Sequence, residues 1–198
     1  MKYPAFYNQV ENIVLYDPLS EFLGAFDDGI IEFTYLDVVK SAGHSCPTVA
    51  GAYLVVQKAL KALYKDELPL RGGLKITIKG HFSEGVNGVI FSVFSQITGS
   101  SGEGGFKGIG GKFSRKDLIY FNNDISGEYQ FERMDNGEKV NLVYQAMPPK
   151  PEQQVLMQKI MGGQASPEEK EIFKDLWQDR VARILLEHHS DESVIRLV

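Results

Sequence analysis

The chain has 198 residues, 43% of them hydrophobic and 24% charged, which suits one globular domain with a sizeable core. Its net charge of −5 argues against nucleic acids and anionic membrane surfaces as partners, because both favour a basic surface. A single cysteine excludes an intrachain disulfide, and neither a signal-peptide core nor an apolar run of roughly 20 residues is present, so we expect a cytoplasmic protein without membrane spans.

Capping and periodicity signals predict four elements in the first third of the chain. Proline at the first position of a helix and glycine just past its end mark helix boundaries. A threonine or serine with an acidic residue three positions later marks a capping box. The expected elements are a short helix between Asp17 and Gly24, a strand at 30–33, a helix from Thr34 to Gly43, and a long helix from Pro47 to Leu63.

Residues 74–144 predict four strands and one further helix. Alternating apolar side chains favour a strand at 74–79, and helical spacing favours a helix from Val86 to Ile97. Asp135-Asn136-Gly137 indicates a hairpin turn. The strands expected after the helix lie at 118–121, 129–132 and 139–144.

The segment after Pro148-Pro149-Lys150-Pro151 predicts two helices, one near 155–160 and one that starts at the capping box of Ser166 and Glu169. The fold class is therefore α+β, with a mixed or antiparallel sheet packed with helices. We expect a core domain at 1–147 and a C-terminal helical extension at 148–198. The long amphipathic last helix can dock on its own domain or on a second copy of the chain, and we expect a homodimer, since symmetric homodimers are the commonest oligomers.

The segment Gly43-His44-Ser45-Cys46-Pro47-Thr48 carries the most informative chemistry in the sequence. Cys46 stands at a helix start, where free N–H groups and the helix dipole stabilise a thiolate. His44 can reach the same small volume from two residues earlier. The pair can hold a soft or borderline metal, or serve as a thiolate–imidazole pair in nucleophilic catalysis. The alternative is an ordinary buried cysteine beside a turn histidine.

The stretch Ser41-Ala42-Gly43-His44-Ser45-Cys46-Pro47-Thr48, continued by Ala50-Gly51-Ala52-Tyr53, resembles the signature of the FmdE-like family, which is named after one of the subunits of formylmethanofuran dehydrogenase. That family typically reads His-Gly-His-x-Cys-Pro-Gly before a helix. Gln96-Ile97-Thr98-Gly99 and the strands from Leu118 to Tyr144 follow the family's order, so the resemblance covers roughly residues 34 to 145. It implies an α+β core, often dimeric, a metal site at the matching His44 and Cys46, and a link to one-carbon chemistry or an oxidoreductase partner protein.

The chain departs from this family pattern at several positions. Ala42 replaces the first histidine of the motif, and Thr48 replaces the glycine after proline. The further cysteines of the family and the cysteine-rich C-terminal zinc finger of some relatives are absent. These differences argue against a cluster or redox role and weaken direct participation in formylmethanofuran chemistry.

A metal ion on His44 and Cys46 needs a further ligand, and His81 is the main candidate because it also lies between a strand and a helix. Glu84 is a weaker candidate, because an acidic residue there also stabilises the next helix start. Zinc is the expected ion, with an open position for water or substrate. His188 and His189 end the last helix, where cationic side chains stabilise the helix C-terminus.

The glycine-rich loop from Gly99 to Lys112 differs from a P-loop, because Phe113 stands where serine or threonine should follow the lysine. We expect a mobile lid over the Cys46 site, since long flexible loops often serve sites. Lys107 and Lys112 are then candidate cofactor-binding residues for an anionic ligand. The alternative is a solvent loop without a ligand.

Three functions remain open. The leading hypothesis is a metal-binding FmdE-like protein that acts in one-carbon or formyl metabolism or as an oxidoreductase accessory subunit, with His44 and Cys46 as ligands and as the catalytic residues if it is an enzyme. The second is a non-catalytic metal or cofactor carrier, or an interaction protein that uses its C-terminal helices. The third is a metal-free Cys/His hydrolase, for which the sequence offers no identifiable Asp or Asn orienter.

Overall fold

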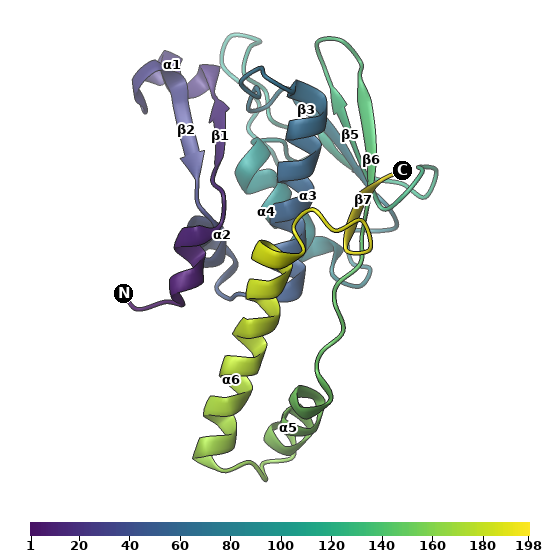
Figure 1. Ribbon diagram of the computed structural model, residues 1–198. Coiled ribbons are helices and arrows are strands. Elements are labelled where there is room, and N and C mark those ends of the chain that lie inside the picture. Colours follow the sequence, from purple (N-terminus) through teal and green to yellow (C-terminus); the bar gives the residue numbers. More distant parts are fainter.

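The computed structural model describes residues 1–198 and shows six α-helices and two sheets (Figure 1). The helices are α1 (Pro18–Leu23), α2 (Tyr35–Ala42), α3 (Pro47–Tyr64), α4 (Asn87–Thr98), α5 (Pro151–Met161) and α6 (Pro167–Ala182). The strands are β1 (Ile13–Tyr16), β2 (Ile30–Phe33), β3 (Leu74–Ile78), β4 (Ile119–Phe121), β5 (Tyr129–Arg133), β6 (Lys139–Tyr144) and β7 (Ile195–Leu197). The predicted α+β class is confirmed.

The five-stranded sheet has the order β4-β3-β5-β6-β7 and is mixed. β3 and β4 pair in parallel, and the other neighbours pair antiparallel. A separate antiparallel pair, β1 with β2, lies at the other side of α3 and α4 (Figure 1). None of the helices combines the length and apolar character that a bilayer crossing requires.

Side-chain caps fix the helix starts at the positions that the sequence predicts. Asp17 accepts hydrogen bonds from the N–H groups of Leu19 and Ser20 at the start of α1. Thr34 with Asp37 forms a full capping box at α2, and Ser166 with Glu169 forms another at α6. These local interactions satisfy donors that a helix cannot pair internally, so sequence alone locates them.

The core lies between the sheet and the helices α3 and α4, and α2 packs against these two helices. α3 is buried along most of its length, and Phe94 of α4 packs edge-on against Tyr129 and Phe131 of β5. The alternate residues of β3, Lys75 and Thr77, point to the opposite, more exposed face. The sheet is therefore packed on one face, as antiparallel and mixed sheets commonly are.

The C-terminal part of the chain returns to this core. Val181, Ile184, Leu185 and Ile195 are buried in the same apolar cluster as α3, and β7 forms an edge strand beside β6. α5 and the first turns of α6 project away from the sheet as a helical hairpin (Figure 1). Residues 148–198, predicted as a helical extension, are thus part projecting hairpin and part core.

Candidate functional site

The turn that carries His44 and Cys46 joins α2 to α3. Gly43 ends α2 with a φ of +75°, a left-handed conformation that glycine adopts without strain. Cys46 is the N-cap of α3, and its Sγ accepts a hydrogen bond from the N–H of Val49 at 3.5 Å. Pro47 occupies the first helical position. Half-buried Cys46 therefore directs its sulfur at the helix start, as the sequence predicts.

His44 is exposed, and its ring is oriented by one hydrogen bond. Nδ1 lies 3.0 Å from the carbonyl oxygen of Ala42. A carbonyl only accepts, so Nδ1 donates this hydrogen bond, which in the neutral ring leaves the lone pair on Nε2. Histidines that bind metals commonly donate their other N–H to a carbonyl in this manner. The imidazole is thus presented with its Nε2 free.

Ser45, between these two residues, fixes the turn from both sides. Its hydroxyl lies 3.0 Å from the hydroxyl of Tyr35 at the start of α2. Its carbonyl oxygen accepts a hydrogen bond of 2.8 Å from the indole Nε1 of Trp177 and a longer one from Gln178, both on α6. The turn is therefore held between the N-terminal helices and the C-terminal helix.

Tyr144, the last residue of β6, fixes the start of α3. Its hydroxyl donates a hydrogen bond of 2.7 Å to the carbonyl oxygen of Pro47. Its ring fills the space above Gly51, where an added Cβ would overlap the ring carbons. Burial raises the pKa of this phenol well above its usual range, so Tyr144 stays neutral and acts as a donor.

Arg180 of α6 places a positive charge beside the turn. Its Nε donates to the carbonyl oxygen of Met147 at 2.7 Å, Nη2 donates to the same oxygen, and no carboxylate pairs with the guanidinium. Burial lowers the pKa of Arg180 below its ordinary value, and the nearby Cys46 has a smaller, opposite effect. A partly buried cation without a carboxylate partner therefore lies in the electrostatic neighbourhood of Cys46.

His81 lies in the loop between β3 and α4. It follows β3, and its own loop holds it, because Glu84 accepts from its N–H and Asn87 donates to its carbonyl oxygen. β3 is separated from β6, whose Tyr144 contacts the Cys46 helix, by β5, an offset of roughly 10 Å. No three His, Cys, Asp or Glu side chains come together to hold a metal ion, so His81 does not join His44 and Cys46 in a three-ligand group.

The glycine-rich loop after α4 lies at the opposite end of α3 from Cys46. Ser100 donates to the carbonyl oxygen of Leu74 at the start of β3, and the N–H of Gly72 donates to that of Thr98. α3 has 18 residues, which separates its two ends by about 27 Å. The loop does not cover Cys46. Lys107 and Lys112 are exposed on it, and their role in anion binding stays a prediction.

The remaining histidines lie at the end of the last helix. His188 Nδ1 contacts the carboxylate of Asp191 at 3.0 Å, and His189 Nδ1 contacts the carbonyl oxygen of Leu186 at the same distance. Both contacts are local and belong to the turn before β7. They agree with the structural role that the sequence favours for these residues.

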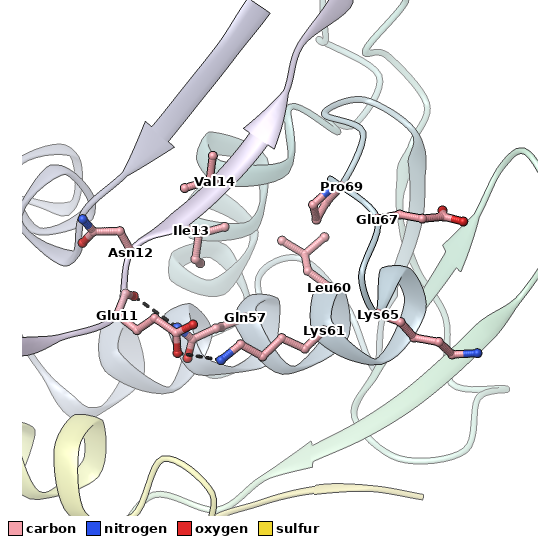
Figure 2. A pocket seen from close by; sticks show the side chains of 10 residues that line it. All are labelled: Glu11, Asn12, Ile13, Val14, Gln57, Leu60, Lys61, Lys65, Glu67 and Pro69. Carbon is pink, nitrogen blue, oxygen red and sulfur yellow. Dashed lines mark hydrogen bonds and ion pairs between the residues drawn. The ribbon is translucent and has the colours of Figure 1, made fainter.

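Two pockets lie in different places relative to the turn. One, of about 310 Å³, lies between α5 and α6 and shares Trp177 and Arg180 with the surroundings of Cys46. The other, of about 250 Å³, lies between β1 and the C-terminal half of α3, beside the exposed ion pair of Lys61 and Glu11 (Figure 2). The second pocket contains neither histidine nor cysteine, and we assign it no role in the site.

The sequence points to His44 and Cys46 but not to the residues that hold them. Tyr144, Trp177 and Arg180 reach the turn through tertiary contacts, and the bond between Trp177 and Ser45 spans 132 residues. No spacing or capping pattern marks them. The tryptophan alone carries a hint, because the chain has a single one and it stands on an amphipathic helix.

The chain matches a known protein family over most of its length. A family model described as "FmdE, Molybdenum formylmethanofuran dehydrogenase operon" matches residues 42–192, which include the His44–Cys46 turn and both C-terminal helices. No curated protein and no solved structure matches the chain.

Proposed function

The chain belongs to the FmdE family, and on that premise we propose that it is a cytoplasmic accessory protein of a formylmethanofuran dehydrogenase-type oxidoreductase. The family description places such proteins with the operon of that enzyme, which supports an oxidoreductase partner. In this proposal the turn from His44 to Cys46 is the functional site. The observation that carries it is the turn itself, locked through Ser45 by Tyr35 and Trp177 while His44 stays exposed.

We propose zinc as the ion that this turn binds, provided that at least one further ligand comes from outside the chain. The donors fit zinc in kind, because zinc takes cysteine sulfur and histidine nitrogen. They fall short in number, because protein zinc sites have three or four protein ligands and this chain gathers no group of three. A zinc ion here would therefore take at least one donor from outside the chain. A second copy of the chain, as in the proposed homodimer, or the oxidoreductase partner would supply it.

The first test is the metal content of the purified protein after exposure to zinc. We expect zinc to be retained, and to be lost in Cys46→Ser and in His44→Ala. His189→Ala is the matched control, because His189 is also exposed and also has Nδ1 on a main-chain carbonyl. Retention of zinc by both variants of the turn would overturn the metal proposal, and no zinc in the parent protein would exclude a second copy of the chain as the source of the missing donor.

A companion measurement identifies the source of the missing donor. The molar mass by light scattering should double on zinc addition if a second copy completes the site, and should stay that of a monomer if the oxidoreductase partner does. If the protein dimerises, His81→Ala tests whether His81 of the second copy is the missing ligand. Loss of zinc would assign the third donor to His81 across the interface, and unchanged zinc would exclude it.

The hydrolase hypothesis has less support. In a catalytic triad a carboxylate or amide side chain orients the imidazole, whereas a main-chain carbonyl, that of Ala42, holds His44.

A non-catalytic carrier or interaction role has a specific observation in its favour. The projecting hairpin exposes large apolar side chains, at 53% for Val155, 80% for Met161 and 45% for Ile172, which suits a protein partner.

A further inference from the structure

The pocket between α5 and α6 has the features of a small-molecule site. Its volume of about 310 Å³ lies near the lower end of the range for such sites, roughly 300–1,000 Å³. It lies next to the Cys46 turn but is formed by other residues, so its binding properties can be measured without a metal. No sequence motif marks it.

Gln153 is the most buried glutamine that lines this pocket. Its exposed fraction is 2%, it lines the pocket, and its amide makes no hydrogen bond to the chain. A pocket-lining amide without a partner in the chain can pair with a ligand that has a donor and an acceptor of its own.

Gln154 and Gln158 extend the same chemistry. They lie one helical turn apart on α5, are exposed, and both line the pocket. The pocket contains no carboxylate, histidine or cysteine, so its chemistry does not suit a metal ion. Three amides instead suit the edge of a heterocyclic base, since an amide can donate to and accept from neighbouring ring atoms at once.

The other walls suit a flat ring with a negative charge. The indole of Trp177 is held in one orientation by its bond to Ser45, and Met157 supplies an adaptable apolar wall. Arg180 uses Nε and Nη2 on the carbonyl oxygen of Met147, which leaves Nη1 without a partner in the chain. An aromatic face and an unpaired guanidinium are the groups that bind a base and a phosphate.

We propose that this pocket binds a nucleoside monophosphate, with the base against Trp177 and the glutamines and the phosphate at Arg180. A base accounts for the three amides, and one cation accounts for one phosphate. This proposal is independent of zinc at the Cys46 turn.

The single tryptophan of the chain makes the test direct, because all tryptophan fluorescence reports from the pocket wall. The zinc-free protein is titrated with AMP and GMP, and separately with adenosine and inorganic phosphate. We expect saturable quenching by a mononucleotide, and binding at least about tenfold weaker for the nucleoside and for phosphate alone, since each lacks one set of contacts. No saturable change with either mononucleotide up to millimolar concentrations would overturn the proposal.

Two variants connect the binding to the pocket. Gln153→Leu and Arg180→Lys should each weaken nucleotide binding about tenfold, because each removes directed hydrogen bonds while keeping the approximate size of the side chain. Gln164→Leu, in the exposed turn between α5 and α6, and Arg196→Lys, on β7, are the matched controls and should bind as the parent does. Circular dichroism shows whether each variant is folded. Unchanged affinity in folded Gln153→Leu would place the ligand elsewhere and overturn the proposal.

Discussion

Gly51 determines how closely β6 approaches the start of α3. Because it has no side chain, the ring of Tyr144 lies against the helix backbone and its hydroxyl reaches the carbonyl oxygen of Pro47. That carbonyl belongs to the residue after Cys46. The position of the sulfur thus depends on a glycine one turn further along the helix.

Gly51→Ala should destabilise the protein by about 1–3 kcal/mol, as overpacking of a core does, and lower its melting temperature by several degrees. The new methyl would overlap the Tyr144 ring, and the ring is held by its own hydrogen bond. Gly88→Ala in α4 is the matched control, because its nearest neighbour would lie at 3.7 Å. That substitution should be neutral or stabilising by up to about 1 kcal/mol, since alanine favours helix. Equal melting temperatures for the two variants would contradict the packing argument.

The sequence predicts the two candidate site residues but not the residues that hold them in place. Cys46 and His44 are recognisable because a helix cap and a short motif are local patterns. Tyr144 and Trp177 are not, because a tyrosine on a strand and a tryptophan on a helix are ordinary core residues until the fold shows what they contact. The position of Gln153 in the pocket is likewise visible only in three dimensions.

Three separate segments meet at one carboxylate on the far side of the molecule. Asp17 caps α1, and it also accepts hydrogen bonds of 2.7 Å from Arg71, before β3, and 2.6 Å from Arg115, after the glycine-rich loop. Arg115 is buried, and its Nε and Nη1 have no partner, so Asp17 provides its only counter-charge. The carboxylate therefore fixes the loop to the helices.

Asp17→Asn should lower the free energy of unfolding at pH 7 by about 3–5 kcal/mol, because it leaves a buried guanidinium unpaired. Burial raises the pKa of Asp17, but the hydrogen bond from Arg71 and the charge of Arg115 outweigh it, and the folded pKa lies below its ordinary value. The stabilisation is thus complete above the unfolded pKa of about 3.9 and is lost as pH falls through the folded pKa.

Urea unfolding at pH 7 and in steps below pH 4 measures this effect. The difference between the parent protein and Asp17→Asn should be constant near neutrality and shrink in acid. Glu11→Gln is the control, because its ion pair with Lys61 is exposed and worth less than about 1 kcal/mol. A difference between the parent and Asp17→Asn that persists unchanged at the lowest pH would contradict the ionic origin of the stabilisation.

The elements themselves were predictable to the extent that their signals are local. All six helices and the strands β2 to β6 follow from caps, glycine stops and alternation. β1 and β7 escape prediction, because strands of four and three residues are defined by their pairing partners more than by their own sequence. The position of the glycine-rich loop could not be predicted either, since no local pattern in its sequence indicates which end of α3 it packs near.

At the level of the whole molecule, the C-terminus contributes to the core. Four buried apolar residues from the last 20 positions, Val181, Ile184, Leu185 and Ile195, join the cluster around α3. Burying such side chains is worth about 1.5–3 kcal/mol each. Their sum is comparable with the entire stability of a typical domain, about 5–15 kcal/mol.

Truncation after Pro151 should therefore unfold the remaining chain rather than release a stable core. Replacement of residues 152–176 by a short flexible linker should leave the core folded, because α5 and the first turns of α6 project from it (Figure 1). Circular dichroism and thermal melting distinguish the two shortened proteins. A cooperative melt of the truncated chain at the parent temperature would show that residues 181–195 are dispensable.

The hydrogen bond between Trp177 and Ser45 can form only late in synthesis of the chain. The two residues are 132 positions apart, and translation adds about 5–20 residues per second. The turn that carries Cys46 therefore exists for many seconds before the helix that fixes it has been made. The thiol of Cys46 is therefore synthesised before the residues that surround it in the folded protein. Any ion or cofactor that needs the finished geometry is taken up after the chain is nearly complete.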